Sequence, residues 1–597
     1  MNGNDFVMYL NSSINVSGDT TGSLAEKQVK SQYFDRMKVE RKLGRYIYDK
    51  IRAGEHHAFV LTGHAGDGKT SILVQILRDL GYLSEGDGLR ETDEFSDFFY
   101  VKDMSELSKK EALRVLKQAL SAPENGKTSL LISNTGPLLK TFASWREEIG
   151  GAGDWDEKEQ LQFKSELLTQ LDQNKDTEIH LTGLEAFPLY LVNIARLDNV
   201  LFSTEIFQKM VGGALWEPCD HCDCMERCPI KHNQDTVAKR FERVSQFVEN
   251  VYRYLYENDK RMTIRQMVAQ LSYGLTGNLS CEDIRRKMIK APLFNYNFAN
   301  LFFGYIGLGE QKEALQIQGI KQLRLLELDH IALDVDYSLF VKQDYSSFFP
   351  EEIQDELGDI AKQCRGLYRI DMENISKNAE QVRREREFRR AVRRYYLVYG
   401  LYDRQEKLNQ LLNQLFGANF MDYLELILKE QSDWKRRKLQ DLVFRALYIK
   451  NTGVLPSGNE LYLTLRRGDG SFQNVMLVLG ETEKRNLKIK QIPTENSFED
   501  QGEKKNLYLC VRNKRFLLSL PMINYFSLLI DGVISSNENP ALTHNIAALD
   551  TLLLDEFGYG KSEDGESLEW KVIVNTARGQ EIRSFAIDRQ QRNITFS

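Results

Sequence analysis

The 597-residue sequence has little of several features that mark specialised classes of protein. Its 11 prolines argue against long proline-rich linkers, and no apolar run reaches the ~18 residues that a membrane helix needs. Seven cysteines are too few for a disulfide scaffold. A net charge of −7 excludes a global basic footprint, so any nucleic-acid contact must come from a local patch. Because the first residues lack a basic start and a signal-type apolar stretch, we expect a cytoplasmic protein.

Strand-like and helix-like patterns alternate in the first part of the chain. Short apolar runs at residues 57–62, 98–101, 129–133 and 189–192 are separated by segments with helical spacing. This alternation predicts a parallel sheet with helices on its faces, an α/β fold. After residue 451 the pattern changes to alternating runs, and the first two flank Gly468-Asp469-Gly470, which is a hairpin signal.

The most specific motif is Gly63-His64-Ala65-Gly66-Asp67-Gly68-Lys69-Thr70, which matches G-x-x-x-x-G-K-T between a predicted strand and a predicted helix. Its glycines allow backbone conformations that turn successive N–H groups toward phosphate oxygens, and the helix adds the positive end of its dipole. We expect Lys69 to bind the β- and γ-phosphates of ATP and Thr70 to bind Mg²⁺. The predicted nucleotide contacts in this P-loop are Gly63, Gly66, Asp67, Gly68, Lys69, Thr70 and Ser71.

Hydrolysis of a nucleotide also needs an acid that holds Mg²⁺ and a polar group that orients water. Asp103 follows the run at 98–101 and is the candidate metal ligand, with Glu106 three residues further on. Asn134 follows the run at 129–133, where it is placed to orient water or to sense the γ-phosphate. The alternative is that Asp103 is only a capping or solvated residue after a strand.

A helical region follows the core from about residue 235. Helices after such a core often form a lid whose arginine reaches the nucleotide, and Arg265 is the candidate, unless it is an ordinary surface arginine. The sequence therefore predicts four parts: a helical segment (1–50), a P-loop NTPase core (51–235), a helical lid and middle domain (236–450) and a β-rich C-terminal domain (451–597).

Four cysteines with the spacing C-x2-C-x-C-x3-C fall within ten positions: Cys219, Cys222, Cys224 and Cys228. Such spacing lets one loop wrap a tetrahedral ion through thiolates, which predicts a structural Zn²⁺. Cys224 is the natural fourth ligand, and His221 or His232 is its substitute. An iron–sulfur cluster and free or redox-active thiols are the two alternatives.

Residues 381–396 hold seven arginines and two glutamates. On a helix, one face carries four of the arginines: Arg383, Arg386, Arg390 and Arg394. Such a face can bind the phosphates of DNA or RNA, or a partner subunit. The alternative is a solvated face, or one paired with acidic neighbours such as Glu351 and Glu352.

A weaker pattern lies near the C-terminus. Asp555 precedes Glu569-Trp570-Lys571, which outlines the Asp…Glu-x-Lys set of metal-dependent nucleases. Triplets of this kind are frequent by chance in a chain with so many acids, so nuclease activity is a minor alternative.

Several segments together resemble one protein family. They are Gly66-Asp67-Gly68-Lys69, Ile132-Ser133-Asn134-Thr135-Gly136-Pro137-Leu138, Cys219-x2-Cys222…Cys228-Pro229-Ile230, Thr263-Ile264-Arg265 and Leu518-Ser519-Leu520-Pro521-Met522. The combination is similar to the ATPase component of bacterial restriction systems that sense DNA phosphorothioation (the DptF type) and to its relatives in other anti-phage systems. The resemblance implies an intracellular ATPase that works with partner subunits to discriminate foreign DNA. A scaffold that holds nucleotide without turnover and a signalling NTPase that oligomerises are the competing hypotheses.

Overall fold

The computed structural model describes residues 3–14, 29–84, 86–149, 157–173, 189–287, 292–363, 379–402, 405–429, 432–465, 474–494, 504–533, 539–559, 568–576, 579–588 and 593–596. The chain divides into two compact units, the first running essentially to Lys407 and the second from Leu408 onward. None of the helices in these ranges is both long enough and apolar enough to cross a membrane.

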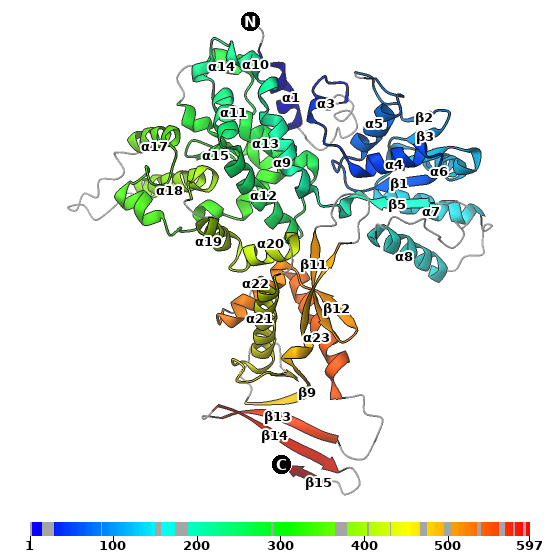
Figure 1. Ribbon diagram of the computed structural model, residues 1–597, viewed down its shortest axis with the longest axis vertical. Helices are drawn as coiled ribbons and strands as arrows, with labels where there is room; N and C mark the ends of the chain where they lie inside the picture. The colour runs from blue at the N-terminus through cyan, green and yellow to red at the C-terminus, as the bar shows by residue number, and fades with distance from the viewer. Residues whose placement is uncertain are drawn as a thin grey trace. The chain divides into compact units, whose positions relative to one another are not determined.

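A five-stranded sheet with the order β2-β3-β4-β1-β5 forms the centre of one part of the first unit (Figure 1). Its parallel strands are β1 (Ala58–Thr62), β3 (Phe98–Val101), β4 (Thr128–Ile132) and β5 (Leu189–Asn193). The edge strand β2 (Thr92–Glu94) runs antiparallel to β3. The expected α/β arrangement is therefore present, and β1 lies between β4 and β5 so that the glycine-rich loop starts in the middle of the sheet.

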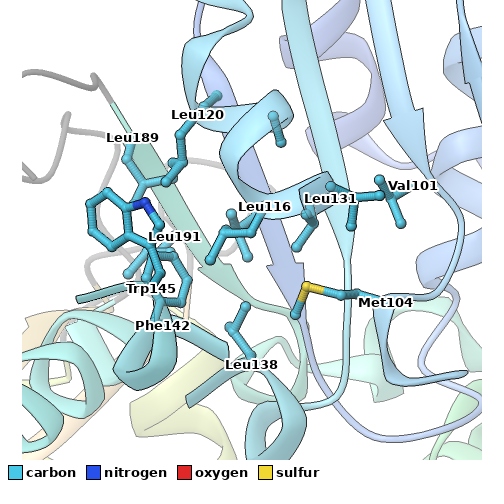
Figure 2. Close-up of a cluster of buried hydrophobic side chains, with 14 of the residues drawn as sticks. Val101, Met104, Leu116, Leu120, Leu131, Leu138, Phe142, Trp145, Leu189 and Leu191 are labelled. Atoms are coloured by element: carbon cyan, nitrogen blue, oxygen red, sulfur yellow. The ribbon is translucent and has the colours of Figure 1, made fainter. Parts of the chain in front are cut away.

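Helices cover both faces of this sheet, which is why its strands are apolar at successive positions. In β1, Phe59 and Leu61 pack toward α4 (Lys42–Arg52) and α5 (Lys69–Asp79). The alternate residue Val60 belongs to the opposite cluster. That cluster, shown in Figure 2, is built with the helices α6 (Lys109–Ser121), α7 (Thr135–Ile149) and α8 (Glu157–Gln173). The carboxyl ends of the parallel strands β1, β3, β4 and β5 lie at one edge of the sheet.

The helical part of the first unit is organised around α13 (Ile264–Thr276), which is buried over most of its length. A capping box between Thr263 and Gln266 fixes its start, and Gly277 ends it in the left-handed conformation. Its neighbours are α1 (Asp5–Ile14), α9 (Ser203–Val211), α11 (Pro229–Lys239), α15 (Phe298–Leu301) and α16 (Gln318–Leu325). The N-terminal helices thus belong to two parts of the first unit. α1 packs on α13 in the helical part, and α4 packs on α5 beside the five-stranded sheet.

The second unit contains helices as well as the expected strands. Its sheets have the orders β15-β14-β13-β9-β8 and β10-β11-β12. Their strands are β8 (Glu460–Thr464), β9 (Val475–Glu483), β10 (Lys488–Pro493), β11 (Lys505–Val511), β12 (Lys514–Leu517), β13 (Leu568–Thr576), β14 (Gly579–Asp588) and β15 (Asn593–Phe596). The expected hairpin partners β8 and β9 pair antiparallel, and Gly468–Gly470 lies outside the described residues.

The second unit begins before residue 451 because helices ahead of that position pack on its strands. The helix α20 (Phe420–Leu428) packs on β11, and α21 (Asp433–Thr452) packs on β8 and β10. Two later helices, α22 (Leu520–Ile530) and α23 (Pro540–Phe557), complete this unit.

Candidate functional site

The loop between β1 and α5 depends on glycine at three positions. Gly63, Gly66 and Gly68 all have positive φ, at 152°, 91° and 90°. Gly66 is further constrained by its surroundings, since a Cβ atom there would lie 2.9 Å from Cβ of Arg265 and 3.0 Å from Oγ1 of Thr263. The backbone N–H of Arg265 donates to the carbonyl of Gly66 at 3.2 Å. The loop therefore touches the start of α13 through a position where only glycine fits.

Lys69 begins α5 and folds back across the loop. Its Nζ donates to the carbonyl oxygens of Gly63 at 2.8 Å and His64 at 3.0 Å. It also lies 3.3 Å from Oδ1 of Asn134, which follows β4 as expected. All these acceptors are neutral, and no carboxylate pairs with Lys69 among the described residues.

Hydroxyl groups tie the ends of β1, β3 and β4 together. Oγ1 of Thr62 and Oγ1 of Thr135 are 2.9 Å apart, and the hydroxyl of Ser105 accepts the backbone N–H of Asn134 at 2.8 Å. Asp103 lies in the same group, because its Oδ1 accepts the N–H of Ser105 at 2.8 Å. Asp103 is thus a cap, as the alternative interpretation held, and it is also fixed at the strand edge where a metal ligand was expected.

A cavity of about 240 Å³ opens at this edge. The expected site residues that line it are Gly66, Gly68, Lys69, Thr70, Ser71, Asp103, Glu106, Asn134 and Arg265. Residues of the N-terminal segments, including Tyr9, Lys38, Val39 and Arg41, complete the wall and were not predicted from the sequence. These residues carry no local motif, so only the folded chain identifies them.

Asp67 has a structural position within the loop. Its side chain is fully buried, and Oδ2 accepts the N–H of His64 at 2.9 Å. Its Oδ1 accepts from the guanidinium of Arg261 at 2.8 Å and from Nδ2 of Asn199 at 3.3 Å. Arg261 and Asn199 were not predicted either, and both bind the loop to the segments that lead to α9 and α13. The Asp67 carboxylate therefore holds the loop, and no described contact directs it into the cavity.

Two of the basic residues that line the cavity, Lys69 and Arg265, are held at an electrostatic cost. Burial lowers the pKa of Lys69 below its usual value, and this outweighs the opposite effects of Asp67 and Asp103. Burial likewise lowers the pKa of Arg265, for which no carboxylate partner exists among the described residues. A site that desolvates two cations beside backbone N–H groups favours a multiply charged anion, because an anion would offset the cost.

The cysteine segment forms a second site in the first unit. Cys219 lies within the short helix α10 (Glu217–Asp220), and Cys228 is the N-cap residue of α11. The ligand atoms of Cys222, Asp223 and Cys224 lie within 4.8 Å of one another, a spacing that can hold a metal ion. Of the two expected substitutes, His221 is exposed and His232 instead contacts Oε1 of Glu356 at 2.6 Å.

Burial in this segment acts on the thiols. It raises the pKa of Cys219 and raises that of Cys228 to about 11, so both are neutral at physiological pH when no cation is bound. Metal binding would release these protons, because the thiolate is the ligand.

The arginine-rich segment forms α18 (Ala379–Tyr399), and its expected face is not uniformly accessible. Arg386 is exposed, whereas Arg394 is completely buried and donates to Oδ2 of Asp329 at 2.8 Å. Arg393 pairs with Asp336 at 2.5 Å. Further pairs join Arg383 to Glu387 and Arg389 to Glu385 within the helix.

Besides these ion pairs, part of the arginine face lines a cavity. The acids are not those suggested by the sequence, since Glu352 pairs with Arg240. Arg386, Arg389 and Arg390 line a cavity of about 360 Å³ together with His330. The exposed arginines of Arg383–Arg394 therefore lie in the first half of the helix.

Two residues of the nuclease pattern, Lys571 and Asp555, have different described partners. Lys571 on β13 donates to both carboxylate oxygens of Glu481 at 2.8 Å. Asp555 lies on α23, 3.8 Å from Nζ of Lys514. The side chain of Glu569 lies outside the described residues. The described contacts thus do not assemble the Asp…Glu-x-Lys set.

Comparison with known proteins gives no independent assignment. No family model matches the chain, and no curated protein or solved structure is significantly similar to it.

Proposed function

We propose that the cavity beside the glycine-rich loop binds Mg²⁺-ATP and hydrolyses it slowly, through a P-loop. The observation that carries this proposal is the convergence of Lys69, Asp103, Asn134 and Arg265, from four separate segments, on one cavity. Each of these residue types has a role in phosphoryl transfer, and the sequence spacing alone does not require them to meet.

The roles follow from the surroundings of each side chain. Lys69 would exchange its carbonyl acceptors for phosphate oxygens, and charge-assisted hydrogen bonds of this kind are stronger than the neutral ones they replace. Thr70 and Asp103 would hold Mg²⁺, with Glu106 nearby at the same wall. Asn134 would orient water or contact the γ-phosphate. The protein supplies positioning and charge, which is most of what this reaction needs.

The nucleotide would act as a switch through α13. Arg265 is the second residue of that helix, and its backbone already contacts Gly66. A γ-phosphate that binds Arg265 therefore contacts an element packed against α1, α9 and α11. A ligand that interacts differently with two arrangements shifts the population between them.

We further propose that this switch serves a cytoplasmic anti-phage or DNA restriction system of the DptF type, as the motif resemblance implies. The nucleotide state would control engagement of partner subunits, or of DNA at the exposed part of Arg383–Arg394. The support for this step is the resemblance and the cavity formed by Arg386, Arg389 and Arg390.

Phosphate release from ATP by the full chain tests hydrolysis. We expect Mg²⁺-dependent release, and we expect Lys69→Ala and Asp103→Asn each to lower it at least ~100-fold, because each removes a charge needed in the transition state. Arg45→Ala is the matched control, since Arg45 is an exposed residue on α4 of the same unit. Absence of release by the wild type, or equal release by Lys69→Ala, would contradict the proposal.

One observation favours a second function, nucleotide binding without turnover. The side chain that meets Lys69 from β4 is the amide of Asn134, which cannot act as a base. A scaffold of this kind would bind ATP tightly and release no phosphate above background. Binding by the wild type combined with loss of binding in Lys69→Ala, without turnover in either, would select this function.

A further inference from the structure

The arginine-lined cavity beside α18 has an unequal balance of charges in its wall. The residues that line it are Val382, Glu385, Arg386, Arg389, Arg390, Arg393 and His330. The wall thus has four guanidinium groups and one carboxylate. Such an excess of positive charge favours an anionic ligand, provided that the charges are not all paired within the fold.

Two of the four arginines are paired and held in place. Arg389 pairs with Glu385 at 2.6 Å, and Arg393 pairs with Asp336 at 2.5 Å. Both guanidinium groups also lie near the ring of Phe340, whose centroid is 5.6 and 5.7 Å from their central carbon atoms. These contacts fix two arginines of the wall before any ligand binds, so less conformational entropy is lost on binding.

The other two arginines have no carboxylate partner in the described part of the chain. Arg386 is exposed, and Nη2 of Arg390 lies 3.5 Å from Nδ1 of His330. Arg386 and Arg390 are four residues apart on α18, a spacing that places two side chains next to each other on one helix face. The cavity therefore has two neighbouring positive charges that the fold does not compensate.

The segment that packs against these arginines has an unusual backbone. The 3₁₀ helix η9 (Leu328–His330) is preceded by Glu327 at φ 48°, and the π-helix η10 (Tyr337–Lys342) is followed by Gln343 at φ 54°. Left-handed conformations are unfavourable for residues other than glycine, and π-helices are rare outside functional sites. The fold thus maintains costly conformations on both sides of the segment that supplies Phe340, which is what a formed binding site requires.

We propose that this cavity binds a terminal phosphate, the phosphomonoester group of a ligand, between Arg386 and Arg390. A phosphomonoester carries close to two negative charges at neutral pH, whereas a phosphodiester of a nucleic-acid backbone carries one. One terminal phosphate therefore offsets both uncompensated arginines. The planar guanidinium group also matches phosphate oxygens in pairs, which favours arginine over lysine at such a site.

Two sources present this chemistry, the 5′-phosphorylated end of a DNA strand and a free phosphorylated small molecule. The first source deepens the proposed DNA restriction function and rests on it, whereas the second does not. Binding at this cavity is separate from binding of ATP, because no residue lines both this cavity and the one beside Lys69.

Fluorescence anisotropy with the full chain and a short single-stranded DNA, labelled at its 3′ end, tests the proposal. We expect the 5′-phosphorylated strand to bind at least ~10-fold more tightly than the same strand with a 5′-hydroxyl, the value of a charge-assisted hydrogen bond. Arg386→Met and Arg390→Met should each abolish this preference. Arg383→Met is the matched control and should keep it, since Arg383 is an exposed arginine of the same helix that does not line the cavity.

A second arm uses ribose 5-phosphate, followed by titration calorimetry in the Lys69→Ala variant so that the glycine-rich loop does not contribute. Heat that depends on Arg386 and Arg390, without a preference between the two DNA strands, would identify a free small molecule as the ligand. A preference for the phosphorylated strand that persists in Lys69→Ala would identify the DNA end, even if the chain does not bind ATP.

Two results would overturn the proposal. One is equal affinity for the two strands with equal losses in Arg386→Met and Arg383→Met, which indicates general attraction to the DNA backbone, combined with no heat from ribose 5-phosphate. The other is binding of neither probe. Thermal denaturation of each variant shows whether it is folded, and the exposed position of Arg386 makes Arg386→Met the decisive variant if Arg390→Met unfolds.

Discussion

Two groups of buried cationic side chains in the first unit are held in opposite ways. On α18, Arg394 is buried against the carboxylate of Asp329 and stacks over the ring of Tyr305 at 3.9 Å. At the candidate nucleotide site, Lys69 and Arg265 are desolvated without a carboxylate partner among the described residues. The first group satisfies its charge within the fold, and the second does not.

This difference separates a structural cation from one that is proposed to bind a ligand. A buried ion pair is neutral as a unit, and removing one partner leaves an uncompensated charge. A cation that contacts only carbonyl and amide oxygens retains its attraction for an anion. Its lowered pKa reflects the free-energy cost of burying the charge without a carboxylate partner. The positions of basic residues in the sequence do not make this distinction, because they do not show which of these residues has a carboxylate partner in the fold.

The largest expected effect tests the structural group. Arg394→Met should lower the free energy of unfolding of the first unit by about 3–5 kcal/mol, because the buried Asp329 would lose its arginine partner. Thermal denaturation measures this, with Arg386→Met, an exposed residue of the same helix, as control within about 0.5 kcal/mol. An effect of Arg394→Met as small as that of the control would break the comparison.

The next effect tests the binding group. Arg265→Ala should weaken Mg²⁺-ATP binding by about 10- to 100-fold, the value of one charge-assisted hydrogen bond. The ligand-free chain should not lose stability, because the substitution removes a desolvated charge and no ion pair. Titration calorimetry and thermal denaturation measure the two quantities. A loss of stability like that of Arg394→Met, with unchanged affinity, would place Arg265 in the structural group.

A third substitution would give Lys69 a carboxylate partner like the one that Arg394 has. Asn134→Asp would place a carboxylate within reach of Lys69 Nζ, which is 3.3 Å from the present amide oxygen. We expect ATP affinity to fall about tenfold, because the carboxylate neutralises Lys69 and repels the triphosphate. Asn134→Ala is the matched control, since it removes the hydrogen bond without adding charge, and it should fall less. Equal losses in the two variants would show that charge at this position is unimportant.

The smallest effect is on pH dependence. Because burial lowers the pKa of Lys69 below 10.5, the ligand-free lysine loses its proton at a lower pH than an exposed one. A triphosphate binds the protonated form, so affinity should fall as pH rises toward 10.5, by at most about tenfold per pH unit. Binding should take up protons in this window. Calorimetry in two buffers with different ionisation enthalpies measures the uptake, and equal heats would count against this account.

The sequence predicted candidate site residues where a local motif or the end of a strand marks them, and their roles stay predictions. The loop Gly63–Thr70 has its own motif, and Asp103 and Asn134 follow strands whose ends meet at one edge of a parallel sheet. In the structure they line one cavity. The α/β class followed from the same alternation of strands and helices.

The parts that depend on tertiary packing were out of reach. Arg261 meets Asp67 only because the chain returns to the loop ahead of α13. The burial of Arg394 could not be predicted from the sequence either, because a helix face rich in arginine is normally exposed to solvent. Likewise, the second unit begins before residue 451 because α20 and α21 pack on strands that come later in the chain.

We propose above all that Lys69 and the loop Gly63–Thr70 bind a polyphosphate. Titration calorimetry of the full chain with a non-hydrolysable ATP analogue and Mg²⁺ tests it most directly. We predict one binding site in the wild type and no measurable heat of binding in Lys69→Ala. No heat in the wild type, or the same affinity in both proteins, would contradict the account.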